Sequence, residues 1–150
     1  MAALDLLTTT NLSYHSIPAA FVLAMIPHTY ANMAAGKNYD LANPRKTAEH
    51  LQKDTTLNKV TLRRIQRAQA AAANGLETIA LYAAAVVAAN TSGRITIPTL
   101  NKLALGYLAA RALYNFTYVI LQDNARIAPL RTLFWAASIG VIFALFTMAA

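Results

Sequence analysis

The residues of this chain that are most able to do chemistry lie in apolar surroundings. Residues 63–82 read RRIQRAQAAAANGLETIALY, and in this alanine-rich stretch Arg67, Asn74 and Glu77 fall within about 80° of one another on a helix. In a bilayer each of these side chains is costly and needs a partner or a function. On one face, a guanidinium, an amide and a carboxylate can hold the polar groups of a small ligand or can bond to one another.

A second polar face is expected further along the chain. Arg111, Tyr114 and Tyr118 are spaced three and four residues apart, which places them on one side of a helix. If the two helices are antiparallel, Glu77 and Arg111 come at matching depth, and we predict a buried charge pair between them. Polarity alone leaves two interpretations open, a structural tie between helices and a ligand site.

The composition predicts that these helices lie in a membrane. Hydrophobic residues make up 57% of the 150 residues and charged residues only 13%, about half of the charge that a soluble domain carries. The chain has no cysteine, so thiolate metal sites and a cysteine nucleophile are excluded. Its histidines, His15, His28 and His50, do not have the spacing of metal ligands, and no metal site is predicted.

The net charge of +7 could suggest a nucleic-acid partner, but the distribution of the charge argues against one. Eight of the thirteen Lys and Arg residues lie between Lys37 and Arg67, beside apolar stretches, and no nucleic-acid-binding motif accompanies them. Membrane topology explains the cluster better. Arginines near the ends of the apolar stretches, such as Arg63, Arg64 and Arg131, are interpreted as topology signals with snorkelling side chains.

Four segments are long and apolar enough to cross roughly 30 Å of hydrocarbon. They are residues 17–35, 62–89, 97–121 and 130–149. The sequence therefore predicts an all-α integral membrane protein, a single domain built as an antiparallel four-helix bundle. Because the amino-terminal segment has no basic region typical of a cleaved signal peptide, the first span is expected to serve as its own signal.

The polar loops predict the direction of the spans. The loop over 36–61 and the loop over 122–129 are basic, whereas the loop over 90–96 carries one arginine, so the first two are expected in the cytoplasm. Both termini then lie on the other side of the membrane. The two N-x-S sequons, at Asn11 and Asn90, fall on that same non-cytoplasmic side.

These polar motifs resemble those of the MAPEG family, the membrane-associated proteins in eicosanoid and glutathione metabolism. The motifs that carry the resemblance are RAQ at 67–69 followed by NGLE at 74–77, NPR at 43–45, and RALYNFTY at 111–118 followed by RIAPL at 126–130. Each motif is short, but their order and placement cover nearly the whole chain.

The resemblance implies a homotrimer in the endoplasmic reticulum or another internal membrane, with glutathione bound as co-substrate between neighbouring protomers toward the cytoplasmic side. Asn74 and Glu77 match residues that hold the polar groups of glutathione, Glu77 being suited to its α-amino group. Tyr114 and Tyr118 match the tyrosines that line the tripeptide. Arg126 matches the arginine credited with activating the thiol.

Three further arginines complete the expected glutathione-binding set: Arg45, a looser match for a carboxylate partner, together with Arg67 and Arg111. The chain departs from the family pattern at Ala70 and Ala72, where some members carry an arginine and a histidine. The missing arginine removes a contact to a glutathione carboxylate.

Candidates to replace that arginine are Arg63, Arg64 and Arg45. The spacing that leads to Arg126 varies among members of the family, so Arg131 competes with it for the position near the thiol.

The resemblance implies a glutathione transferase that also has possible glutathione peroxidase activity, acting on a lipophilic electrophile delivered from the lipid bilayer. Two alternatives stay open. One is a non-catalytic lipid-binding or scaffold protein on the same fold, which the alanines at 70–73 favour. The other is a pocket redirected to an isomerase or cyclase step in a biosynthetic pathway.

Overall fold

The computed structural model describes residues 7–150, and no strand is found in that range. The helices of twenty residues or more within it are α2 (Ser16–Ala35), α4 (Lys59–Thr91), α5 (Ile97–Val119) and α6 (Ala128–Ala149). They cover nearly the same residues as the four predicted segments. The prediction of an all-α chain is confirmed.

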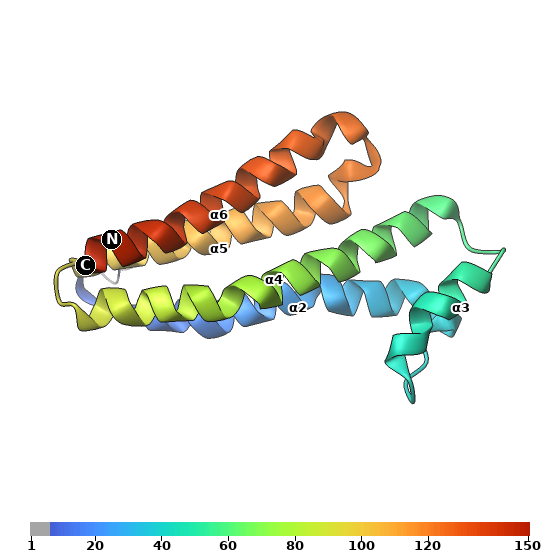
Figure 1. The fold of residues 1–150 in the computed structure, drawn as a ribbon, viewed down its shortest axis with the longest axis horizontal. Helices are drawn as coiled ribbons and strands as arrows, with labels where there is room; N and C mark the ends of the chain where they lie inside the picture. The colour runs from blue at the N-terminus through green and yellow to red at the C-terminus, as the bar shows by residue number, and fades with distance from the viewer. Residues whose placement is uncertain (1–6) are drawn as a thin grey trace.

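Shorter helices lie in the connections between the long ones. They are η1 (Ser13–His15), η2 (Gly36–Asn38), η3 (Pro44–Lys46), α3 (Thr47–Lys53), η4 (Leu121–Asp123) and η5 (Ala125–Ile127). Sequence reasoning predicted no helix in the 36–61 loop. In the structure this loop contains the short helix α3, which lies at one end of the molecule (Figure 1).

The four long helices lie side by side with α2 against α4 and α5 against α6 (Figure 1). In α4 the buried positions are mostly small residues, among them Ala68, Ala71 and Ala85, which let the neighbouring helices approach closely. The approach is close at Gly75, where an added Cβ would come to 2.7 Å from the Cβ of Ala24 on α2. A methyl group at this position has no room while the two helices keep this separation.

Pro27 interrupts the hydrogen-bond pattern of α2 without ending the helix. Proline has no N–H, so the carbonyl of Leu23, four residues earlier, loses its helical donor. The side-chain amide of Asn115 on α5 donates to that carbonyl at 3.0 Å. A side chain from a neighbouring helix therefore satisfies the backbone group that the proline leaves free.

At one end of the molecule a polar network ties the segment before α2 to the neighbouring helices. The Asn101 side chain on α5 accepts from the backbone N–H of Leu12 at 2.8 Å and donates to the carbonyl of Thr10 at 2.8 Å. The Ser16 Oγ and the Tyr82 hydroxyl share a buried hydrogen bond of 2.6 Å. This end holds the start of α2, the α4–α5 connection and the end of α6 (Figure 1).

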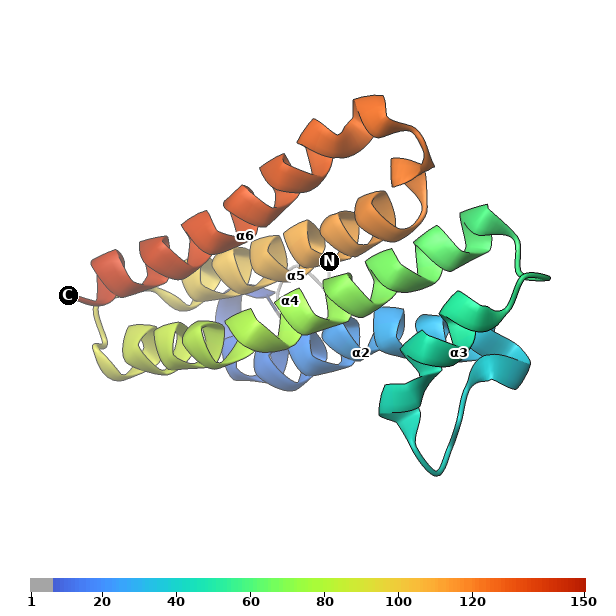
Figure 2. The ribbon, with the colours of Figure 1, turned by 45° about the vertical axis from the view of Figure 1, so that its right-hand side comes forward.

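Toward the opposite end α6 and α4 move apart. Figure 2 shows the same divergence as Figure 1, with the start of α6 well separated from α4. Because the helices are antiparallel, the two basic loops of the sequence both lie at this wider end.

Two segments of the described chain are long and apolar enough to cross a membrane. They are Lys59–Thr91, which is α4, and Ala125–Ala149, which is η5 together with α6. The other two predicted spans correspond to α2 and α5, and their crossing of the membrane stays a prediction, as does the direction of all four.

Candidate functional site

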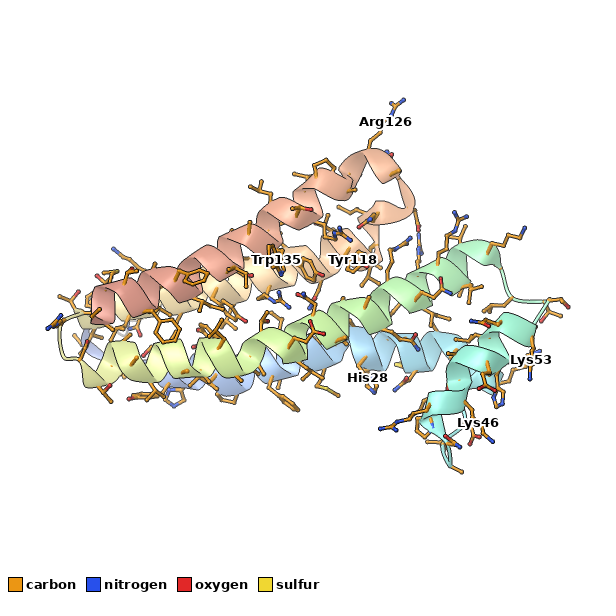
Figure 3. The ribbon with its side chains drawn as sticks, viewed as in Figure 1. His28, Lys46, Lys53, Tyr118, Arg126 and Trp135 are labelled. Carbon is orange, nitrogen blue, oxygen red and sulfur yellow. The ribbon has the colours of Figure 1, made fainter. Side chains whose placement is uncertain are left out.

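A polar pocket lies among α4, α5 and α6 near the wider end. Its volume is about 290 Å³, and it is lined by Asn74, Tyr114, Arg131, Thr132 and Trp135. In Figure 3, Trp135 and Tyr118 lie in the region between α6 and α4. Hollows on other faces, such as the groove between α2 and α5, have mostly apolar linings. The polar pocket is therefore the site in which a ligand with charged or hydrogen-bonding groups would be recognised.

Arg111 supports this pocket from behind. The residue is only 4% exposed, and its Nη1 donates to the Oδ1 of Asn74 at 2.9 Å. Its guanidinium lies over the ring of Tyr114, 4.9 Å from the centroid, whereas its Nη2 has no hydrogen-bond partner. A buried guanidinium thus holds both the amide and the ring that form part of the pocket wall.

The predicted charge pair between Glu77 and Arg111 is wrong for this protomer. Glu77 is exposed, and it forms no ion pair with any residue in the range 7–150. Three residues along a helix correspond to a rotation of about 60° away from Asn74. Glu77 is left exposed, and the neutral Asn74 lies beside Arg111 instead.

The sequence allows two interpretations of Arg131, a topology signal at the end of a span and a competitor of Arg126 for the position near the thiol. In the structure it lines the pocket, and its guanidinium lies over the ring of Tyr118, 4.6 Å from the centroid. The rings of Tyr114 and Tyr118 are 5.7 Å apart and tilted. Cation–π contact holds the planar group on one face and leaves its edge free to donate.

Arg67 lies outside the pocket and ties α4 to the end of α5. Its Nη2 donates to the carbonyl of Val119 at 3.1 Å and to the carboxylate of Asp123. Arg64 binds the same carboxylate, through its Nε at 2.8 Å. The hydrogen bonds from these arginines, first that from Arg64, hold the pKa of Asp123 below its usual range. Sequence reasoning did not identify Asp123.

Arg45 and Arg126 are also away from the pocket of their own protomer. Arg45 is exposed in η3, beside α3. Arg126 is exposed in η5 at the tip of the α5–α6 connection, and its side chain points away from the other helices (Figure 3).

The structure thus brings together four of the predicted site residues: Asn74, Arg111, Tyr114 and Tyr118. Sequence reasoning missed Thr132 and Trp135. They share one side of α6 with Arg131, but this helix is apolar on nearly every side, so its sequence alone does not single out that side. No group of three or more His, Asp or Glu close enough to hold a metal ion occurs within residues 7–150.

Within residues 7–150 the fold is all-helical, two of its segments are long and apolar enough to cross a membrane, and a polar pocket lies among the helices, a combination typical of helical membrane proteins. More particularly, the chain belongs to the MAPEG family, whose sequence profile matches residues 16–150. A comparison with curated proteins found no match. A comparison with solved structures found none either.

The resemblance inferred from the short motifs is therefore confirmed at the level of the family. Membership supports a function of the general kind that the family name describes, in membrane-bound eicosanoid and glutathione metabolism.

Proposed function

We propose that the protein is a membrane-bound glutathione transferase that activates the glutathione thiol for attack on a lipophilic electrophile. The observation that supports this function best is the gathering of Asn74, Tyr114 and Tyr118 around one polar pocket, held by the buried Arg111. In a MAPEG chain these are the residues whose motifs match those of glutathione sites. Peroxidase activity toward lipid hydroperoxides would use the same activated thiol.

The assembly that we propose is a homotrimer in the endoplasmic reticulum or another internal membrane. Glu77 is exposed on α4 beside small exposed residues, among them Ala73, Ala80 and Ala84. A carboxylate facing hydrocarbon is costly, and small residues allow close helix packing, so this face is suited to a neighbouring protomer. Glu77 is then available to the α-amino group of a glutathione molecule bound between protomers.

In such an assembly Arg126 would act on the pocket of the adjacent protomer. Its exposed position and outward direction support this role better than a role in its own protomer (Figure 3). Arg45, in the neighbouring basic loop, would contact the glutathione carboxylate from the same end. Arg67 would contribute by holding the wall of the pocket through Asp123.

The chemistry needs no side-chain nucleophile. A free thiol titrates near about pH 8.5, so at neutral pH only a few per cent is ionised. A guanidinium close to the sulfur in a partly desolvated site favours the thiolate, and the proton leaves to water. The thiolate then forms a carbon–sulfur bond with an electrophile that reaches the site from the bilayer, and the leaving group or the opened ring of the electrophile takes the electron pair.

The experiment that tests this function is glutathione titration of the purified protein, with thiolate formation followed by ultraviolet absorbance. We expect saturable thiolate formation in the native protein and its loss in Arg126→Ala. Arg94→Ala, at the opposite end of the molecule, is the matched control and should behave as the native protein. Thiolate that persists in Arg126→Ala would reject the role of Arg126, and a native protein that binds no glutathione would reject the function.

A second candidate is a non-catalytic lipid-binding or scaffold protein, or a pocket redirected to an isomerase or cyclase step. The specific observations in its favour are the absence of an arginine at Ala70 and the engagement of Arg67 by Asp123, because both remove cations from a glutathione carboxylate. Lipid binding by a folded protein that does not bind glutathione would select this candidate.

A further inference from the structure

We propose that Arg131 is the residue that binds a ligand carboxylate in the pocket among α4, α5 and α6. The inference deepens the proposed function and rests on it in one respect, that this pocket receives the ligand. It names a recognition residue that the family motifs do not include, and it assigns the anionic group of the ligand to one wall of the pocket.

The first observation is the charge of the pocket. Arg131 lines it and forms no ion pair within the described chain, 7–150. Arg111, directly behind the wall, is bonded only to the neutral amide of Asn74. Two guanidiniums therefore lie near one pocket with no carboxylate bonded to either of them. An anionic ligand would supply the missing charge, and charge-assisted hydrogen bonds to it would be strong in a partly desolvated site.

The second observation is that the other arginines proposed to bind a ligand carboxylate are engaged elsewhere or lie outside the pocket. Arg64 and Arg67 are both bonded to Asp123. Arg63 is exposed and donates to the backbone carbonyl of Lys59 on its own helix. Arg45 is exposed beside α3, outside the pocket. Within a protomer, Arg131 is the arginine left to replace the one that the chain lacks at position 70.

The third observation is the geometry of the guanidinium. The ring of Tyr118 lies 4.6 Å from its central carbon and covers one face. This contact restrains the side chain, so less freedom is lost when the edge of the guanidinium binds the two oxygens of a carboxylate. Thr132 and Trp135, from the same first turns of α6, supply a hydroxyl and an aromatic wall beside it.

The carboxylate could come from two sources. One is glutathione, which carries two. The other is an amphiphilic acid whose chain extends along the apolar residues that α6 exposes, such as Leu133 and Phe143. Both present the same group to Arg131, so the experiment must separate them by the rest of the molecule.

The test compares each acid with its ester, because esterification removes the charge and keeps the remaining structure. The two pairs of probes are oleate with methyl oleate and glutathione with its diethyl ester, measured by equilibrium binding to the full-length protein in detergent. The variants are Arg131→Gln, which removes the charge, and Arg131→Lys, which keeps it. Arg63→Gln is the matched control, an exposed arginine outside the pocket.

For at least one pair we expect the acid to bind about tenfold more tightly than the ester, the loss that follows when one charge-assisted hydrogen-bonded contact is removed. Arg131→Gln should abolish that preference for oleate and reduce it for glutathione, whose second carboxylate is assigned to Arg45. Arg131→Lys should keep part of the contribution of Arg131, and Arg63→Gln should keep all of it. The thermal unfolding temperature of each variant shows whether it is folded. If Arg131→Gln does not fold, the inference is tested with Arg131→Lys instead.

Each outcome has a separate meaning. A preference for oleate over its ester that requires Arg131, with no glutathione binding, supports the inference and rejects the proposed transferase. A preference for glutathione over its ester that requires Arg131 supports both. If neither acid is preferred over its ester, or if the preference is undiminished in Arg131→Gln, the inference is overturned whether or not glutathione binds.

Discussion

At the residue scale, the site depends on how a buried cation is satisfied. Arg111 lies in the interior with a neutral partner, Asn74, whereas Glu77 is exposed. A hydrogen bond from a charged donor to a neutral acceptor is a weaker interaction than an ion pair. Removal of the acceptor nevertheless leaves a buried charge without that hydrogen bond. The amide is therefore the more important of the two α4 side chains for the stability of the protomer.

We expect Asn74→Ala to lower the free energy of unfolding by about 1–3 kcal/mol, because it removes the hydrogen-bond acceptor of a buried guanidinium. Glu77→Ala should cost less in the monomeric state, since Glu77 makes no ion pair in the protomer. The measurement is thermal unfolding in a detergent that keeps the protein monomeric. If Glu77→Ala lowered the free energy of unfolding more than Asn74→Ala, that result would support the charge pair between Glu77 and Arg111.

Helical periodicity was sufficient to predict which polar residues share one face of a helix. It was insufficient to predict which way every helix face is turned in the bundle. The spacing of Arg111, Tyr114 and Tyr118 specifies one face without reference to any other helix. The rotation of α6 is different, because this helix is apolar on nearly every side and its sequence has no periodicity that identifies the inner face. The position of Arg131 is decided by packing, so sequence reasoning named it as a candidate for the site but could not choose between the site and the membrane surface.

At the element scale, the contact between α2 and α4 determines the shape of the protomer. The alanines of α4 and the absence of a side chain at Gly75 allow α2 to approach so closely that an added Cβ at Gly75 would come to 2.7 Å from the Cβ of Ala24. The four long helices were predictable because each is a long apolar segment ended by polar residues. The short helices of the 36–61 loop were not, because that loop is polar throughout and α3 has only seven residues.

Gly75→Ala should destabilise the protomer by about 1–3 kcal/mol, because the new methyl group would press α2 away from α4. The matched controls are Gly106→Ala and Gly140→Ala, where an added Cβ meets nothing within 4 Å and where alanine is the better helix former. Thermal unfolding of the three variants in detergent compares them directly. Equal unfolding temperatures for all three would show that the close approach is absent.

A second prediction at this scale concerns Asp123, which joins α4 to the end of α5 through Arg64 and Arg67. Its folded pKa is lowered, so its contribution to stability is present above its unfolded value of about 4 and is lost as the pH falls through the folded value. Asp123→Asn should therefore unfold at a lower temperature than the native protein at pH 7, and the two proteins should converge at acidic pH.

Asp54 is also held at a lowered pKa, chiefly by its hydrogen bond from the Thr56 hydroxyl, but it titrates in both proteins and cancels in the comparison. A constant difference between native protein and Asp123→Asn from pH 7 to about pH 3 would contradict the assignment of this link to an ionised carboxylate.

At the scale of the whole molecule, the two ends have different characters. The end that holds the α4–α5 connection is tied by hydrogen bonds between side chains, and the sequon residues Asn11 and Asn90 take part in it by bonding to each other. Asn90 also donates to the carbonyl of Val86 and to Ser13 Oγ. Hydrogen bonding within the protein thus accounts for both asparagines. The predicted orientation therefore rests on the charges of the loops.

The orientation can be measured because the chain has no cysteine of its own. We expect Leu41→Cys, at a position that is 84% exposed, to react with a membrane-impermeant maleimide only from the cytoplasmic side. Thr91→Cys, at the exposed end of α4, should react only from the other side. The reverse pattern of labelling would invert the topology, and labelling of both from one side would contradict the antiparallel arrangement of the spans.

The position of Trp135 has a practical consequence. It is the only tryptophan of the chain and it lines the polar pocket, where 39% of the residue is exposed. Excitation of the indole therefore makes the unmodified protein its own optical sensor: its emission comes from this one pocket, and a ligand that displaces water from the ring should shift that emission toward shorter wavelengths. A library of unlabelled compounds can then be screened for the natural occupant of the site.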